Sequence, residues 1–127
     1  MQQNVIDTVS AMTAALERGD IDTVMSFYTD DAVVAFEPGT PVGGEEQLRA
    51  GFAAFAAVKP DFRYDNGHEV MLTGDIAVHI APWTMSGTAP DGTQITQGGL
   101  SVATLRHQAD DSWKIMLDNP FGARLIP

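Results

Sequence analysis

The feature that most constrains the fold is a change of periodicity near residue 60. Before it, apolar residues recur every three or four positions, as in Val5, Val9 and Met12, which places them on one face of a helix. After it, long β-prone stretches alternate with short turns such as Thr73-Gly74-Asp75, a pattern typical of strands. Helices followed by a run of hairpin-connected strands predict an α+β domain with the helices on one face of the sheet.

Start and stop signals give the limits of the expected elements. Gly19 ends the first helix, and Asp20 can cap a short second helix that runs to Tyr28. A third helix begins at Glu45, whose charge suits a helix N-terminus, and it ends before Pro60. We predict strands over residues 32–36, 62–72, 76–87, 93–107 and 112–118, with a turn-rich loop over 38–44, a bulge at 66–67 and a bulge or bend at 98–99.

Length and composition exclude several functions. A chain of 127 residues forms one domain. Its net charge of −10 disfavours binding to nucleic acids and to anionic membrane surfaces. The absence of cysteine excludes disulfides and thiol nucleophiles, and no apolar stretch approaches the ~18 residues of a transmembrane helix. The first twenty residues lack the features of a signal peptide, so we expect a cytoplasmic protein.

A series of short motifs runs through the chain in a characteristic order. The motifs are Gly19-Asp20-Ile21-Asp22, Phe27 to Val33, Glu37-Pro38-Gly39, Gly43-Gly44, Gly74-Asp75-Ile76-Ala77, Trp83, Asp91-Gly92-Thr93 and Trp113 to Gly122. In this order they resemble the nuclear transport factor 2-like (NTF2-like) superfamily, which includes ketosteroid isomerases and the SnoaL-like polyketide cyclases. The resemblance implies one cone-shaped domain over residues 1–127, with N-terminal helices packed on one face of a curved antiparallel sheet. It also implies a homodimer formed through the other face of the sheet.

Steroid isomerisation can be tested against the residues that this resemblance aligns. A ketosteroid isomerase needs a Tyr and a protonated Asp as its oxyanion hole and an Asp as its base. The Tyr position falls on Met12 and the second acid at or near Ser101, and neither side chain can replace these groups. The base position falls on Phe36, with Glu37 one residue away. We therefore expect no steroid isomerase activity.

The polyketide cyclase branch requires less, because it relies chiefly on one pocket Asp as acid and base. Asp118 on the last strand is the candidate, and strand alternation places Met116 on the same face as Asp118. If that face lines the cone, burial would raise the pKa of Asp118 toward a range useful for proton transfer. Alternatively, Asp118 braces the loop Asn119-Pro120-Phe121-Gly122, since Asp before Asn-Pro is a common turn former. Both interpretations remain open at this stage.

Two other residues are candidates for catalysis. His79 shares a strand face with Trp83 and could contribute a polar contact, or it could be a structural histidine. Glu37 lies where the isomerases hold their base, although a Glu before Pro-Gly is more often a solvated loop residue. Trp83 is expected to form a wall for a flat ligand. The expected ligand contacts are Met12, Phe36, Phe52, Phe55, Trp83, Met85, Ser101 and Met116.

Two functions from different classes follow. The first is a domain that binds a small apolar molecule and acts as a cofactor-independent isomerase, cyclase or hydrolase-type enzyme, with Asp118 as acid and base. The second is a non-catalytic binding or dimerisation module whose cone is filled by apolar side chains. The histidines show no metal-ligand spacing and no phosphate-binding loop occurs, so we expect no metal and no cofactor.

Overall fold

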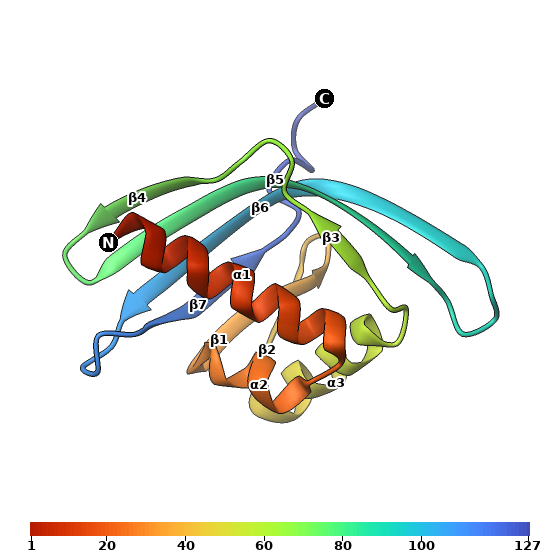
Figure 1. The fold of residues 1–127 in the computed structure, drawn as a ribbon, viewed down its shortest axis with the longest axis horizontal. Helices are drawn as coiled ribbons and strands as arrows, with labels where there is room; N and C mark the ends of the chain where they lie inside the picture. The colour runs from red at the N-terminus through yellow and green to blue at the C-terminus, as the bar shows by residue number, and fades with distance from the viewer.

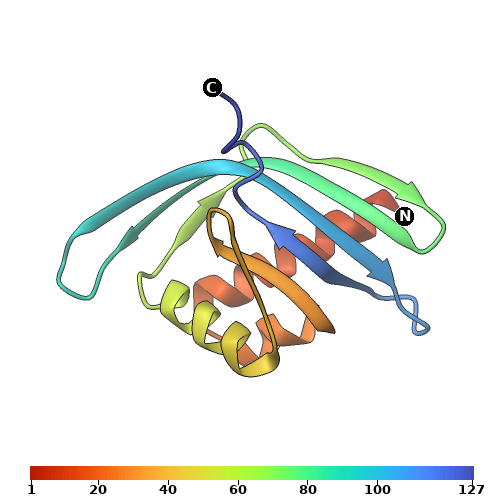
Figure 2. The same cartoon turned by 180° about the vertical axis from the view of Figure 1, so that it is seen from behind.

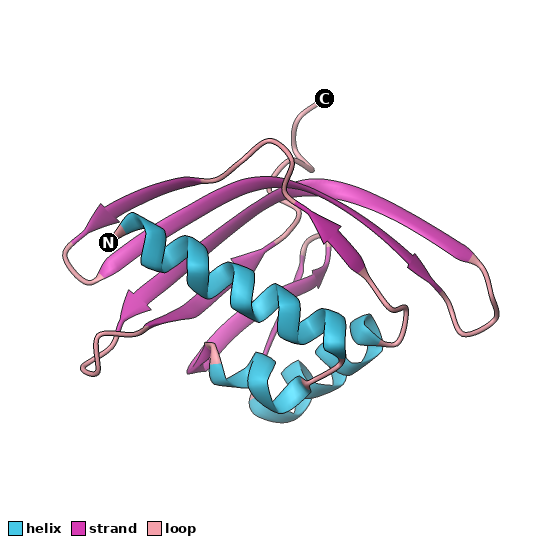
Figure 3. Cartoon of the chain, viewed as in Figure 1, coloured by secondary structure: helices cyan, strands magenta, loops and turns pink.

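The computed structural model describes all 127 residues, Met1–Pro127. Three helices lie beneath the concave face of an arched sheet of seven strands (Figures 1 and 3). The elements are α1 (Gln2–Arg18), α2 (Ile21–Ser26), β1 (Tyr28–Glu37), β2 (Thr40–Gly43), α3 (Glu45–Ala56), β3 (Asp61–Arg63), β4 (Glu69–Thr73), β5 (Ile76–Thr88), β6 (Gln94–His107) and β7 (Trp113–Asn119). The α+β cone predicted from the sequence is thus confirmed.

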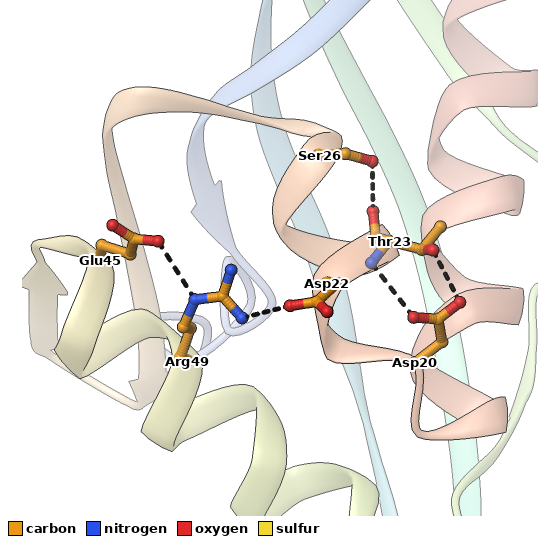
Figure 4. Close-up of polar contacts among 6 residues, drawn as sticks. All are labelled: Asp20, Asp22, Thr23, Ser26, Glu45 and Arg49. Carbon is orange, nitrogen blue, oxygen red and sulfur yellow. Dashed lines mark hydrogen bonds and ion pairs between the residues drawn. The ribbon is translucent and has the colours of Figure 1, made fainter.

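The helices begin and end where local chemistry dictates. Gly19 ends α1 in the left-handed conformation, with φ of 73°, which glycine adopts without steric cost. Asp20 caps α2, because its carboxylate accepts hydrogen bonds from the amide and the hydroxyl of Thr23 (Figure 4). At the surface, Arg49 of α3 bonds to Asp22 of α2 and to Glu45 of its own helix (Figure 4). These contacts link α2 and α3 at the surface of the protein.

The sheet differs from the expected one in that it is mixed. Its strand order is β2-β1-β7-β6-β5-β3, and β4 pairs with the other half of β5. All neighbours are antiparallel except β1 and β7, which run parallel and lie side by side in Figure 2. The pair can be parallel because a long connection separates the two strands in sequence. Between β1 and β7 the chain forms α3 and the strands of the other half of the sheet, and β7 then lies between β1 and β6.

Four local predictions need correction. The stretch 62–72 forms two strands rather than one, because Gly67 turns the chain with φ of 84° where a bulge was expected. The expected loop 38–44 contains the short strand β2, and Tyr28 begins β1 rather than ending α2. Gly98 and Gly99 form no bulge, since β5 and β6 pair without interruption through them. A Cβ at Gly99 would lie 2.8 Å from the Pro120 carbonyl oxygen, so glycine is needed there for close approach rather than for bending.

The hydrophobic core lies between the helix layer and the concave face of the sheet. It is a cluster of 16 buried residues, to which α1 contributes Val5 and Val9 and the central strands contribute Leu105 and Ile115. The C-terminal segment rises from the opposite, convex side of the sheet (Figure 2). None of the helices has the length and apolar character needed to cross a bilayer. The cavity described next lies in the same layer, between the helices and the concave face.

Candidate functional site

A cavity opens between the helices and the middle of the concave face. The cavity has a volume of about 70 Å³, and 15 of its 19 lining residues are hydrophobic. No Lys, Arg or His lines it, and Asp118 is its one acidic residue. Six of the expected ligand contacts lie in this lining: Met12, Phe36, Phe52, Phe55, Trp83 and Ser101. An apolar cleft with a few polar groups is the usual form of a small-molecule site.

Aromatic rings form much of the cavity wall and pack against one another. At one side, Phe52 of α3 lies with its ring centroid 5.0 Å from those of both Tyr28 and Phe36. A second series of rings consists of Phe55, Phe62, Trp83 and Phe121. The centroids of successive rings in this series are 5.6, 5.8 and 6.5 Å apart. Mutual contact fixes these rings in place, so they present flat, preformed surfaces to a ligand.

Trp83 forms part of the cavity wall, and its indole N–H is already used in a hydrogen bond. Its indole Nε1 donates a hydrogen bond to the carbonyl oxygen of Pro120, at 2.9 Å. Gly99, its partner on β6, leaves room for this contact, since a Cβ there would lie 3.2 Å from Nε1. The indole therefore contributes area rather than a polar contact to the cavity.

Asp118 is the chemically distinctive group of the cavity. It lies on β7 between Val34 of β1 and Ala103 of β6, and its Oδ2 accepts a hydrogen bond from the Tyr28 hydroxyl at 2.6 Å. Burial raises the pKa of the Asp118 carboxyl, and the bond from Tyr28 opposes part of this rise. Burial and the adjacent carboxylate raise the pKa of Tyr28 well above its usual value. Tyr28 therefore stays protonated and keeps donating to Asp118.

A bulge in β7 brings Asp118 into the cavity. Two adjacent residues of β6 pair with Ile115 and Leu117, which leaves Met116 as the extra residue of the strand. Ile115 and Asp118 consequently both line the cavity although they are three positions apart, and Met116 does not line it. The expectation that Met116 faces the ligand with Asp118 is wrong, because it assumed unbroken alternation along the strand.

Three further predicted site residues lie outside the cavity lining. His79 is fully buried, and its Nε2 lies 2.8 Å from Nδ1 of His68. Met85 is buried on the same face of β5, and Glu37 is exposed at the end of β1. His79 and Met85 do share the inward face with Trp83, but the cavity occupies only the middle of that face. No group of three or more His, Cys, Asp or Glu side chains is arranged to hold a metal ion.

The sequence analysis missed three polar residues of the cavity: Tyr28, Tyr64 and Thr13. Both tyrosines of the chain line the cavity, and the Tyr64 hydroxyl lies 3.0 Å from Oγ1 of Thr13. Burial raises the pKa of Tyr64. The chain has only two tyrosines, and this scarcity is a signal that could have singled out Tyr28 and Tyr64. No comparable signal in the sequence marks Thr13.

Comparison with known proteins supports the fold. The family model for the SnoaL-like domain matches residues 9–114. No curated protein matches the sequence significantly. A Novosphingobium aromaticivorans structure, provisionally described as an aromatic ring hydroxylase, is 26% identical, with a TM-score of 0.83 over 99% of this chain and 90% of that one.

Two further solved structures share the fold at lower identity. An NTF2-like superfamily protein of Salmonella enterica is 13% identical, with a TM-score of 0.84 over 93% of this chain and 87% of that one. A Xanthomonas campestris protein, provisionally described as a calcium/calmodulin-dependent protein kinase II association domain, is 22% identical, with a TM-score of 0.79 over 93% and 86%. Together with the family match, they show that this chain belongs to the SnoaL-like domain family of the NTF2-like superfamily.

Proposed function

We propose that the cavity binds a small, uncharged and largely apolar molecule and that Asp118 exchanges a proton with it. The observation that carries this proposal is the Asp118 carboxyl, held by Tyr28, in a cavity whose lining is otherwise mostly aromatic and aliphatic. Burial raises the pKa of this carboxyl and so brings it closer to the range in which one group can both give and take a proton. This chemistry suits a cofactor-independent isomerase or cyclase.

The division of roles follows from the hydrogen bond between the two residues. Tyr28 gives its hydrogen to Oδ2 of Asp118, so Oδ1 is the oxygen left to meet the ligand. When Asp118 is neutral it can donate to a ligand carbonyl, and when ionised it can remove a proton from an adjacent carbon. Tyr28 stabilises the ionised form and holds the carboxyl in one orientation.

The character of the lining supports an uncharged ligand. No cationic side chain faces the cavity, so a buried anion would have no partner there. The packed aromatic rings of Phe55, Phe62 and Trp83 favour a flat or aromatic molecule. The description of the Novosphingobium aromaticivorans neighbour, at 26% identity, agrees with an aromatic ligand.

The direct test is a thermal-unfolding screen of small ketones, phenols and polycyclic carbonyl compounds on three proteins. These are the wild type, Asp118→Asn and Asp30→Asn, a control at an exposed position of β1. A ligand at 100 times its Kd stabilises the fold by about 2.7 kcal/mol, a shift of several degrees. We expect stabilising compounds for the wild type and the control, and proton exchange or turnover that Asp118→Asn loses. Compounds that bind all three proteins equally and exchange no proton would favour the non-catalytic binding module.

We also infer that the convex face of the sheet pairs two copies of the chain. Val33, Val102 and Leu117 lie side by side on that face, and Leu117 is 48% exposed. Covering such a surface is a common reason for association, and the Xanthomonas campestris neighbour is described as an association domain. Light scattering after size exclusion should give twice the chain mass of 13.6 kDa. A mass of one chain would contradict this inference.

A further inference from the structure

Two hydroxyl groups at one side of the cavity form a chain in which every hydrogen is committed. Thr13 of α1 donates from Oγ1 to the carbonyl oxygen of Val9, at 2.9 Å. The same Oγ1 lies 3.0 Å from the Tyr64 hydroxyl oxygen. A threonine hydroxyl carries one hydrogen, so while Thr13 donates to Val9 it can only accept from Tyr64. Tyr64 therefore directs its own hydrogen toward Thr13, where it cannot be donated to a ligand.

This arrangement satisfies both hydroxyl groups in the ligand-free protein. In the reverse arrangement Thr13 would donate to Tyr64, and the hydrogen of Tyr64 would point into an apolar space without an acceptor. An unpaired buried donor costs more than a made hydrogen bond gains. Thr13 is 7% exposed, which leaves its hydroxyl little water to turn to. The oxygen of Tyr64 is thus presented to the cavity as an acceptor.

The other polar groups of the cavity differ from Tyr64 in this respect. The hydrogens of Tyr28 and Trp83 are given to Asp118 and to Pro120. Asp118 and Ser101 remain as the groups able to donate to a ligand. A well-matched molecule therefore places an acceptor near Asp118 and a donor near Tyr64.

We propose that Tyr64, with its hydrogen held by Thr13, is a specificity-determining residue that selects ligands carrying a hydroxyl group. The ligand class is a small neutral hydroxy-ketone, with its carbonyl at Asp118 and its hydroxyl donating to Tyr64. This assignment rests on the proposed function of the cavity. It adds a second polar contact that neither the acid–base chemistry nor the aromatic walls require.

The test compares two probes, 4′-hydroxyacetophenone and 4′-methoxyacetophenone, which differ in whether they can donate a hydrogen bond. Their Kd values are measured by calorimetry on the full chain. We expect the wild type to prefer the hydroxy compound about five- to tenfold, the range of one hydrogen bond. Tyr64→Phe should reduce this preference to less than about twofold.

Thr13→Val sharpens the test, because it removes the acceptor that orients Tyr64. The freed hydrogen of Tyr64 can then point into the cavity, so affinity for the methoxy compound should rise relative to the hydroxy compound. Thr8→Val is the matched control, since Thr8 lies on the same helix outside the cavity lining and makes the same type of bond, to the Asn4 carbonyl. It should leave the preference unchanged. A preference for the hydroxy compound that survives Tyr64→Phe would overturn the proposal.

A ligand-free measurement separates this proposal from the function of the cavity. In proton NMR spectra, the hydroxyl hydrogen of Tyr64 should show a nuclear Overhauser effect to the methyl group of Thr13. A hydroxyl hydrogen directed away from Thr13 would overturn the proposal even if both ketones bind. Failure of both ketones to bind the wild type would instead count against the proposed ligand class, while the NMR result still decides the orientation of Tyr64.

Discussion

Two polar pairs lie on the concave side of the sheet, and only one of them faces a cavity. Asp118 bonds to Tyr28 at 2.6 Å, and His79 lies 2.8 Å from His68. His79 and Asp118 are in one row across the sheet, since both pair with Ala103 from opposite sides. At the usual strand spacing they are about 10 Å apart.

The difference between the pairs is the space beside them. His79 is fully buried outside the cavity lining, and its Nδ1 has no hydrogen-bond partner. Burial, together with the neighbouring His68, lowers the pKa of His79 to about 4. Asp118 also favours its neutral form, but its carboxyl opens on the cavity. A perturbed pKa therefore marks both pairs, whereas only Asp118 lines the cavity.

The largest expected effect that tests this contrast is the pH dependence of stability from His79. Its pKa is about 4 in the fold against 6.5 for a free histidine, so unfolding takes up a proton between these values. The stability that neutral His79 contributes is present above pH 6.5 and is lost as the pH falls toward 4. Chemical denaturation at pH 7 and pH 4 should show a loss of roughly 3 kcal/mol from this group.

His79→Gln provides the comparison, because glutamine can still bond to His68 but does not titrate. The variant should lose less stability than the wild type over the same pH range. Equal losses in the two proteins would mean that His79 is charged or solvated in the fold. Ligand affinity at pH 7 should be the same in both, since His79 does not line the cavity.

The next effect concerns the partner of Asp118. Tyr28→Phe removes the hydrogen bond to the buried Asp118 carboxyl and should cost about 1 to 2 kcal/mol, with the larger cost where the carboxyl is ionised. It should also raise the pKa of Asp118 further, because the Tyr28 bond lowers it. Tyr64→Phe is the matched variant and should cost about 1 kcal/mol, since it removes a bond between neutral groups. Equal costs at every pH would show that the bond from Tyr28 does not depend on the ionisation of Asp118.

A smaller effect, of opposite sign, is expected at Asp118 itself. The pKa of Asp118 is raised in the fold, so its ionisation reduces stability as the pH rises above 3.8 and through the raised value. Asp118→Asn should therefore be more stable than the wild type at pH 7, and the gain should vanish in acid. Denaturation curves at both pH values measure this. A loss of stability at pH 7 would identify Asp118 as a structural brace.

The smallest effect is expected at the surface, away from both pairs. Arg49 bonds to Asp22 and Glu45, and all three side chains are more than 40% exposed (Figure 4). Exposed ion pairs contribute little to stability. Arg49→Ala should leave the melting temperature and ligand affinity unchanged within experimental error. A clear drop in either would show that the α2–α3 contact supports the cavity.

The sequence was sufficient for the parts of the fold that depend on local signals. The helix ends at Gly19 and Asp20, the hairpin at Gly74 and the apolar face of α1 all follow from short-range chemistry, and the structure agrees. The motif order led to the NTF2-like superfamily, which the family match confirms. Six apolar or small residues expected at the cavity also lie there, because side chains on the inner faces of helices and strands converge beneath the arch.

The parts that the sequence could not predict depend on register. One extra residue at Met116 changes which side chains of β7 face inward, and nothing in the local sequence marks that bulge. The parallel pairing of β1 with β7 brings Tyr28 to Asp118 across 90 positions of sequence. How far the cavity extends along β5 likewise depends on how the helices cover the sheet, so the sequence could not show that His79 and Met85 lie outside its lining.

The most direct test of the account is a titration of Asp118 by carbon NMR. The side-chain carboxyl of Asp118 is followed against pH in the free protein and with 4′-hydroxyacetophenone bound, with Asp118→Asn used to assign the signal. The account predicts a pKa above the ordinary aspartate value of 3.8 in the free protein and a further change when the ketone binds. An Asp118 that titrates at its ordinary value and does not respond to the ketone would contradict the claim that this carboxyl is the reactive group of a ligand site.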